Sequence, residues 1–309
     1  MRKNINTETI VGRVYQHSLE VKTVKNEASA NFGKEYIAGT IDIAIDETGL
    51  NVIPVHYSYV TPQTSKGYSN KTYTALSQII ENGKTWIKDG KDAATIVKAS
   101  PALALNEFYS NGELVSVKQN EGGFIDILAS MDNEKVKNKF KVDILITKIT
   151  EKEADEERGY PAYVVVKGAI FDFRNKLLPM EFSVRTKDGM DFFLSQIEAS
   201  ASEPYYTCIW GEINCSTQIV TKTEESAFGE AAVTTYERKS KDWTITGMLT
   251  EPYDFGAEDV MTVEEVKNAM QVREVDLAEL KKRAEENAIK KAPAAAKTSA
   301  PVQAGEFQF

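Results

Sequence analysis

Hydrophobic and polar side chains alternate along residues 36–46, YIAGTIDIAID, and again along residues 162–172, AYVVVKGAIFD. In both stretches the branched aliphatic residues fall on one face of an extended chain, and most polar residues fall on the other. A period of two residues is typical of a strand with one buried face. Turn signals follow each stretch, DETG and RNK, so each strand is predicted to fold back as a hairpin.

The tetrapeptide LSQI follows both hairpins, and apolar residues at helical spacing around it predict short helices near 72–82 and 189–199. A strand precedes each hairpin, and two β-rich stretches follow each helix. The order strand, hairpin, helix, strand, strand therefore occurs twice, which indicates a duplicated unit. The alternative is two unrelated β domains in which LSQI occurs twice by chance. The predicted strands are 8–24, 36–46, 50–60, 94–105 and 113–128, then 139–152, 162–172, 177–185, 205–220 and 241–249, with a long polar loop before the last.

Five strands with a helix between the third and fourth is the order of the OB-fold, a small Greek-key barrel. The predicted fold class is mostly β: two tandem OB-like five-stranded barrels, each with a short helix, over residues 1–132 and 139–255. An immunoglobulin-like sandwich or a phage-type shell domain also fits the strand number, but the helix at the same place in both units favours the barrel. The helix should close one end of each barrel, so we expect Leu76, Ile79, Ile80, Phe193, Leu194 and Ile197 to be buried.

The chain changes character after the second unit. Thr262 and Glu265 form a capping box, and residues 261–291 predict a helix. Residues 292–309 are rich in Ala and Pro, which predicts a disordered tail. Its tip has the form of a partner-docking motif on a flexible tether, with Glu306, Phe307 and Phe309 as the docking residues. The alternative is that the tip folds back onto a barrel.

Composition allows two domains with proper cores, because the chain has 309 residues, of which 42% are hydrophobic and 27% charged. No run of 18 apolar residues and no signal-peptide core is present, so we expect no membrane association and a cytoplasmic protein. Cys208 and Cys215 are predicted to be free thiols. The net charge of −9 disfavours partners recognised through gross positive charge, so a nucleic-acid site would have to be a local groove.

Motifs for catalysis and cofactors are sparse. GKT at 83–85 lacks the earlier glycine of a phosphate loop, because position 78 is Gln, and His17 and His56 are the only histidines. We therefore predict no enzymatic activity, no cofactor and no metal. Glu20-Val-Lys22 has the shape of a nuclease E-x-K element, so a metal-dependent nuclease stays as the third hypothesis.

OB barrels often bind single strands on the face of strands 2 and 3 and on the adjoining loops, where rings stack on bases and cations meet phosphates. The second unit interleaves aromatic and basic residues at this place. The alternative for each ring is that it covers an open side of the barrel or the interface between the units. The candidates in the second unit are Tyr163, Lys167, Phe171, Phe173, Arg174, Lys176, Arg185, Lys187, Tyr236, Arg238, Lys239 and Lys241. Those in the first are Lys34, Tyr57, Tyr59, Lys66, Tyr68, Lys71 and Tyr73.

Tandem barrels, an acidic isoelectric point and a low-complexity tail ending in Phe resemble the single-stranded DNA-binding proteins of replication. The stretch NFGKEYIAGTIDIAIDETGLNVIPVHY is similar to those encoded by bacteriophages. The resemblance implies sequence-tolerant binding of single-stranded DNA in replication or recombination inside the bacterial host cell. It also implies no catalysis, and recruitment of replication or recombination proteins through the tail.

Bacterial members of this group end in several acids followed by Ile-Pro-Phe, whereas this chain ends in one acid and Phe-Gln-Phe, so its tip departs from their pattern. The alternative from a different class is a phage structural or assembly protein built from two β domains. Such a protein has no need to expose Phe171 beside Lys167 and Arg174.

Overall fold

The computed structural model describes residues 4–132, 134–135, 137–154, 161–224, 228 and 232–295. Strands hold far more of them than helices do, which confirms the mostly-β prediction. The first half comprises β1 (Asn6–His17), β2 (Glu20–Thr23), β3 (Glu35–Ala44), β4 (Val52–Val60), α1 (Lys71–Asn82), α2 (Trp86–Asp89), β5 (Ile96–Ser110) and β6 (Glu113–Leu128). The second half comprises β7 (Asn138–Lys152), β8 (Tyr163–Phe171), β9 (Leu177–Val184), α3 (Lys187–Gln196), β10 (Tyr205–Glu224) and β11 (Ala232–Met248), and α4 (Val263–Ala295) follows.

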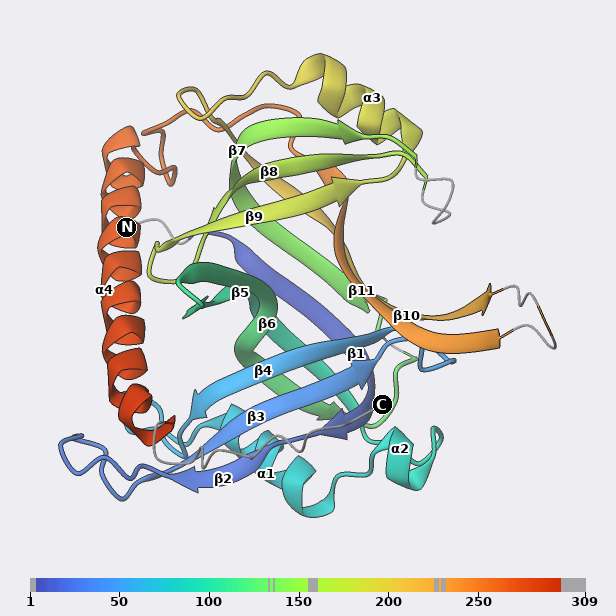
Figure 1. The fold of residues 1–309 in the computed structure, drawn as a ribbon, viewed down its shortest axis with the longest axis vertical. Helices are drawn as coiled ribbons and strands as arrows, with labels where there is room; N and C mark the ends of the chain where they lie inside the picture. The colour runs from blue at the N-terminus through green and yellow to red at the C-terminus, as the bar shows by residue number, and fades with distance from the viewer. Residues whose placement is uncertain are drawn as a thin grey trace, which may run out of the picture.

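The strands form one 11-stranded sheet in the order β10-β11-β9-β8-β7-β1-β5-β6-β4-β3-β2 (Figure 1). Additional pairing of β10 with β7 and of β1 with β3 makes a circuit of five paired strands in each half. Two separate barrels are not confirmed, because β1 pairs with β7 from Asn6↔Val142 to Ile10↔Asn138 and joins the halves. The parallel pairings that complete the circuits are also short: β9 meets β11 only at Ser183↔Thr244.

With β2 and α2 set aside, the two halves repeat the same order of elements, as predicted. Helix α1 follows β4 and helix α3 follows β9, and Leu76 and Ile79 of α1 are buried in the core. The prediction was wrong for Leu194, which is 46% exposed. Phe193 takes the inward position in α3 instead, so the second LSQI does not place its leucine as the first one does.

A glycine at the same place in both halves extends the repeat. A Cβ atom on Gly39 of β3 would lie 2.3 Å from the Ser18 carbonyl oxygen, and one on Gly168 of β8 would lie 2.3 Å from that of Leu145. Both residues sit beside irregularities in strand register, where neighbouring backbones approach closely. The shared glycine therefore reflects the same strand contact made twice.

Buried side chains form two clusters. The larger one runs through both halves and includes Ile41 and Ile79 as well as Ile144 and Phe182. The smaller one lies against the start of α4. It consists of Leu145, Ala169, Phe171, Leu177 and Tyr206 from the second half and Met261, Val266 and Ala269 from the chain after it.

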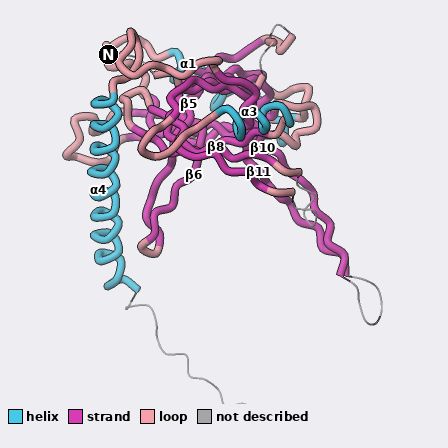
Figure 2. Tube along the Cα trace, turned by 90° about the horizontal axis from the view of Figure 1, so that it is seen from above, coloured by secondary structure: helices cyan, strands magenta, loops and turns pink. Residues whose placement is uncertain are grey.

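The structure changes the prediction at the ends of several elements. Predicted strand 8–24 is two strands, β1 and β2, and most of the predicted polar loop before residue 241 is paired strand, from Glu224↔Ala232 to Cys215↔Lys241. Figure 2 shows this β10–β11 hairpin and the β5–β6 hairpin projecting from the sheet on the same side as α4.

Helix α4 continues to Ala295, so the prediction of disorder from residue 292 was wrong for its first residues. The docking residues Glu306, Phe307 and Phe309 lie outside the described residues. Of the helices in the described part of the chain, none is long and apolar enough to cross a membrane.

Candidate nucleic-acid interface

The predicted interface of the second half lies on the outer face of β8 and β9. Inward residues such as Val166 and Phe182 belong to the core, so their neighbours in each strand point outward. Register pairs Phe171 with Leu177 at one end of this face and Lys167 with Glu181 nearer the other. We call the part around Tyr163, Lys167, Glu181, Arg185 and Asp242 the open end.

The opposite end of the face is covered. Phe171 is 0% exposed, so the prediction that its ring stacks on a base was wrong. The ring packs edge-on against Tyr206, with centroids 6.4 Å apart, and belongs to the small cluster closed by Met261 and Val266. An apolar outward patch gains stability when it is removed from water, and the chain after residue 252 supplies the cover.

At the open end, a cation lies over an aromatic ring. The guanidinium carbon of Arg185 is 4.8 Å from the ring centroid of Tyr163, and its Nε donates to Asp242 Oδ2 over 2.7 Å. Asp242, half-buried in β11, also accepts from the hydroxyls of Ser183 and Thr244. The cation and the ring are thus held together at the surface.

Two lysines complete the open end. Lys167 forms an ion pair with Glu181 directly across the strands. Lys118 reaches it from β6 of the first half: its Nζ donates to the Glu181 carbonyl oxygen over 2.7 Å and lies 4.7 Å from a Trp243 ring centroid. Burial lowers the pKa of Lys118, while the charges of Asp242 and Glu181 act in the opposite direction. Sequence reasoning missed Lys118 and Asp242, because no local pattern shows that β6 and β11 meet β9.

The turn between β8 and β9 exposes a second ring. Phe173 is 79% exposed, and the Arg174 guanidinium carbon lies 5.0 Å from its centroid. Asp172 shapes the turn by accepting from the backbone N–H groups of Arg174 and Lys176. Phe173 is therefore accessible to solvent, and the nucleic-acid-binding roles of Phe173 and Arg174 stay predictions.

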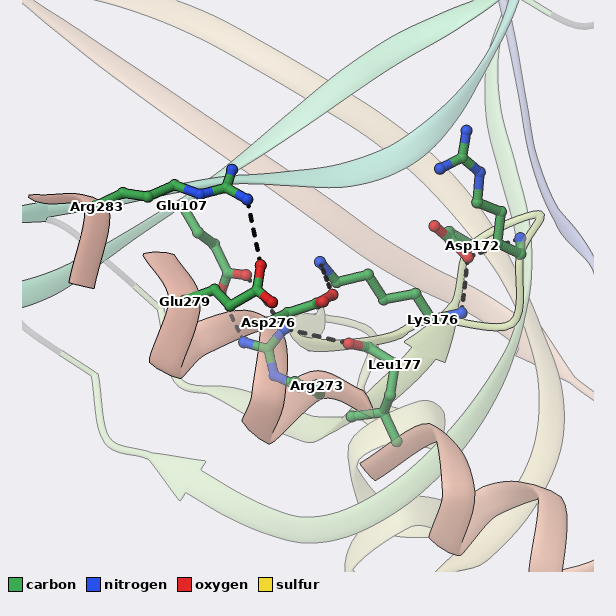
Figure 3. Close-up of polar contacts among 9 residues, drawn as sticks. Glu107, Asp172, Lys176, Leu177, Arg273, Asp276, Glu279 and Arg283 are labelled. Carbon is green, nitrogen blue, oxygen red and sulfur yellow. Dashed lines mark hydrogen bonds and ion pairs between the residues drawn. The ribbon is translucent and has the colours of Figure 1, made fainter. Parts of the chain in front are cut away.

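Lys176 has a different environment from its neighbours. It pairs with Asp276 of α4 over 2.8 Å, beside Arg273, which binds both carboxylate oxygens of Glu107 and the Leu177 carbonyl oxygen (Figure 3). Lys176 thus helps to hold α4 rather than standing free for a phosphate.

A cavity of about 640 Å³ lies between this part of α4 and strands β4, β5 and β6. Its charged lining is mixed and slightly acidic, so it does not suit a polyanion. The acidic residues are Glu107, Glu121, Asp276 and Glu279, and the basic ones are Lys176, Arg273 and Arg283.

The remaining candidates of the second half are scattered. Lys187 is exposed at the start of α3, and Lys241 is exposed on β11. The side chains of Tyr236, Arg238 and Lys239 lie outside the part that the structure describes, although their backbone belongs to β11.

In the first half, β3 and β4 correspond to β8 and β9. Tyr57 is fully buried, and burial raises its pKa, so its predicted stacking role was wrong. Tyr59 is exposed and lies against Tyr36, with centroids 4.6 Å apart, although Tyr36 was not among the predicted residues. Tyr73 packs against the core. Lys34, Lys66, Tyr68 and Lys71 are exposed on the surrounding loops and the start of α1.

The described residues contain no cluster of three or more His, Cys, Asp or Glu side chains that could hold a metal ion. Cys208 and Cys215 are free and buried, as predicted.

Solved structures similar to this chain include two of the single-stranded DNA-binding protein from Thermus aquaticus. The wild-type protein has 11% sequence identity and a TM-score of 0.47 over 83% of this chain and 97% of that one. A replication protein A heterotrimer bound to single-stranded DNA has 11% identity and a TM-score of 0.21 over 90% of this chain and 70% of that one. At these values the similarities establish no activity for the chain.

A search of curated proteins finds no match. A protein-family model does match: YorF, over residues 4–283. This range covers both halves of the sheet and most of α4. The chain therefore belongs to the YorF family.

Proposed function

We propose that the chain binds single-stranded DNA without base-sequence preference, with the open end of the β8–β9 face as its principal contact. The observation that supports this best is the Arg185 guanidinium over the ring of Tyr163, with Lys167 on the same strand as Tyr163. A base can stack on a ring only when it is unstacked from its neighbours, so such a surface favours single strands over duplex.

The charges of the open end indicate how tightly a strand is held. Lys167 and Arg185 already pair with Glu181 and Asp242, so a phosphate has to replace or join a carboxylate. The Lys167–Glu181 pair is exposed, and such pairs contribute only about 0–1 kcal/mol, so replacing Glu181 there costs little. We therefore expect moderate affinity that falls steeply with salt.

Tyr36 and Tyr59 on β3 and β4 offer the first half a comparable stacking pair. We propose that each half is one OB-like binding module, and that a strand long enough contacts both. The role we propose is in phage DNA replication or recombination inside the bacterial host, with partner proteins recruited through Glu306, Phe307 and Phe309. That role is supported by the resemblance of the sequence to phage single-stranded DNA-binding proteins.

Fluorescence anisotropy with a labelled oligo-dT and a duplex of equal length, in EDTA and over a salt series, tests the proposal. We expect the single strand to bind more tightly and to weaken at least fivefold in Tyr163→Ala combined with Lys167→Ala. Lys139→Ala is the matched control, because Lys139 forms a similar exposed ion pair with Glu212 on the part of β7 that pairs with β10.

Equal binding of duplex and single strand, or equal loss in the control variant, would contradict the proposed site. No binding at low salt would favour the phage structural protein instead. Metal-dependent cleavage of the oligonucleotide without EDTA would favour the nuclease.

A further inference from the structure

We infer that Asp242 is a positioning residue: with Ser183 and Thr244 it presents the Arg185 guanidinium as a fork for one phosphate of the DNA backbone. The inference rests on the proposed function and deepens it. It assigns a role to a carboxylate that, by charge alone, should oppose binding of a polyanion.

The carboxylate of Asp242 is fixed from beneath. Its Oδ2 accepts from Ser183 Oγ over 2.9 Å and from Thr244 Oγ1 over 3.1 Å, and Ser183 is buried. These strand residues lie at the single register pair between β9 and β11. Asp242 is therefore anchored to the sheet on one side and faces Arg185 on the other.

The guanidinium of Arg185 is restrained twice. Its Nε donates to Asp242, and its central carbon lies over the ring of Tyr163, 4.8 Å from the ring centroid. Its two terminal nitrogens have no hydrogen bond to any residue in the described ranges, and the side chain is exposed. A guanidinium binds phosphate through two parallel N–H donors, and a pre-positioned fork loses less conformational entropy on binding.

Glu181 on the same face provides the contrast. It pairs with Lys167 and is exposed, but its carboxylate accepts no hydroxyl hydrogen bond from the described residues. Glu181 therefore acts as a plain counter-ion that competes with phosphate. Removing either carboxylate takes away one negative charge, yet the two changes should alter DNA affinity in opposite directions.

The experiment compares Asp242→Ala and Glu181→Ala in the full chain by anisotropy with oligo-dT over a salt series. We expect Glu181→Ala to bind equally well or up to about threefold more tightly. We expect Asp242→Ala to bind about five- to tenfold more weakly, with a salt slope smaller by about one, since one phosphate contact is lost. Asp242→Asn keeps the shape of the side chain and an acceptor oxygen, so its affinity for oligo-dT should lie between those of the wild type and Asp242→Ala. Because this substitution disturbs the fold less, it shows whether the loss in Asp242→Ala comes from misfolding.

A double-variant cycle separates positioning from general damage. If Asp242 acts through Arg185, adding Asp242→Ala to Arg185→Ala weakens binding no further. The inference would be overturned if Asp242→Ala bound oligo-dT as much more tightly as Glu181→Ala does. It would also be overturned if the affinity lost through Asp242→Ala added to the affinity lost through Arg185→Ala.

Inorganic phosphate tests the fork without DNA. We expect it to shift the side-chain ¹⁵N resonances of Arg185 in the wild type and not in Asp242→Ala. If phosphate shifts these resonances in the wild type alone but the chain does not bind oligo-dT, the phosphate fork is supported and the proposed function is wrong. No shift in the wild type would overturn the fork.

Discussion

The indole nitrogen of Trp243 on β11 donates a hydrogen bond to Glu8 Oε1 on β1 over 3.1 Å, across 235 residues of sequence. Both side chains are buried, and Lys118 lies over the indole ring. A residue of the second half thus contacts two residues of the first. Because the carboxyl of Glu8 is removed from water, its pKa is raised to about 8, against the opposing effect of the Trp243 hydrogen bond.

Glu8 should make stability fall as pH rises. Its pKa in the folded protein lies above the ordinary value of 4.5, so its stabilising contribution is complete below about pH 4.5 and is lost as pH rises through about 8. Within that window the slope reaches up to about 1.4 kcal/mol per pH unit for one proton. Glu8→Gln cannot ionise, so its free energy of unfolding should depend less on pH and exceed that of the wild type at pH 9.

Urea unfolding at pH 6, 7, 8 and 9 measures this difference. Glu181→Gln is the control, because it makes the same carboxylate-to-amide change at an exposed position. The same slope in Glu8→Gln as in the wild type would show that Glu8 does not cause it.

The attachment of α4 should depend on one ion pair. Arg273 and Glu107 are part-buried, with 11% and 10% side-chain exposure, so removing one partner should destabilise the attachment, by less than the about 3–5 kcal/mol of a fully buried pair. Burial alone would raise the pKa of Glu107, but hydrogen bonds from Arg273 and Ser116 bring it below its usual value. Arg273→Ala should therefore loosen α4 and increase proteolytic cleavage within residues 263–295.

Arg283→Ala is the matched control for that experiment. Arg283 pairs with Glu279 within α4, and their side chains are 73% and 60% exposed, so its loss should cost under about 0.5 kcal/mol. Equal protease sensitivity in the two variants would show that the Arg273–Glu107 pair does not hold the helix.

Local patterns were enough to predict most of the elements. Alternation along β3 and β8 marks strands because each has one face in the core, and the spacing of Leu76 and Ile79 marks α1 for the same reason. The repeated order follows from these local signals. Pairing of β1 with β7 does not, because strand alternation specifies which face is buried and not which strand lies alongside.

In the candidate site, too, local patterns predicted which residues face outward but not which distant segments lie against them. Alternation correctly placed Phe171 opposite the core, but nothing within β8 indicates that Met261 and Val266 cover it. Likewise, Asp242 and Lys118 reach the open end from strands distant in sequence. Residues of the turn itself, such as Phe173 and Arg174, were predictable because a short turn leaves them exposed.

The two cysteines should be unreactive in the folded protein. Burial raises the pKa of both Cys208 and Cys215 to about 12, and the thiolate is the reactive species. We expect a thiol reagent such as 5,5′-dithiobis(2-nitrobenzoic acid) to label neither at pH 8 within minutes, and both in urea. Rapid labelling of the native chain would contradict their burial.

Phe171 and Phe173 lie two residues apart, yet replacing Phe171 should affect mainly stability and replacing Phe173 should affect mainly DNA binding. Phe171→Ala empties a fully buried position, which costs about 3–5 kcal/mol, whereas Phe173→Ala removes an exposed ring and should change stability by less than about 0.5 kcal/mol. A stacked base is worth about 1–3 kcal/mol, so Phe173→Ala should weaken oligo-dT binding at least fivefold.

Urea unfolding and anisotropy on the same preparations separate the two effects, with binding measured where Phe171→Ala is still folded. Phe171→Ala should then bind nearly as the wild type does, because its ring faces the Met261 and Val266 cover and not solvent. Strong loss of binding in folded Phe171→Ala, with none in Phe173→Ala, would mean that the cover opens and that the strand contacts the face beneath α4.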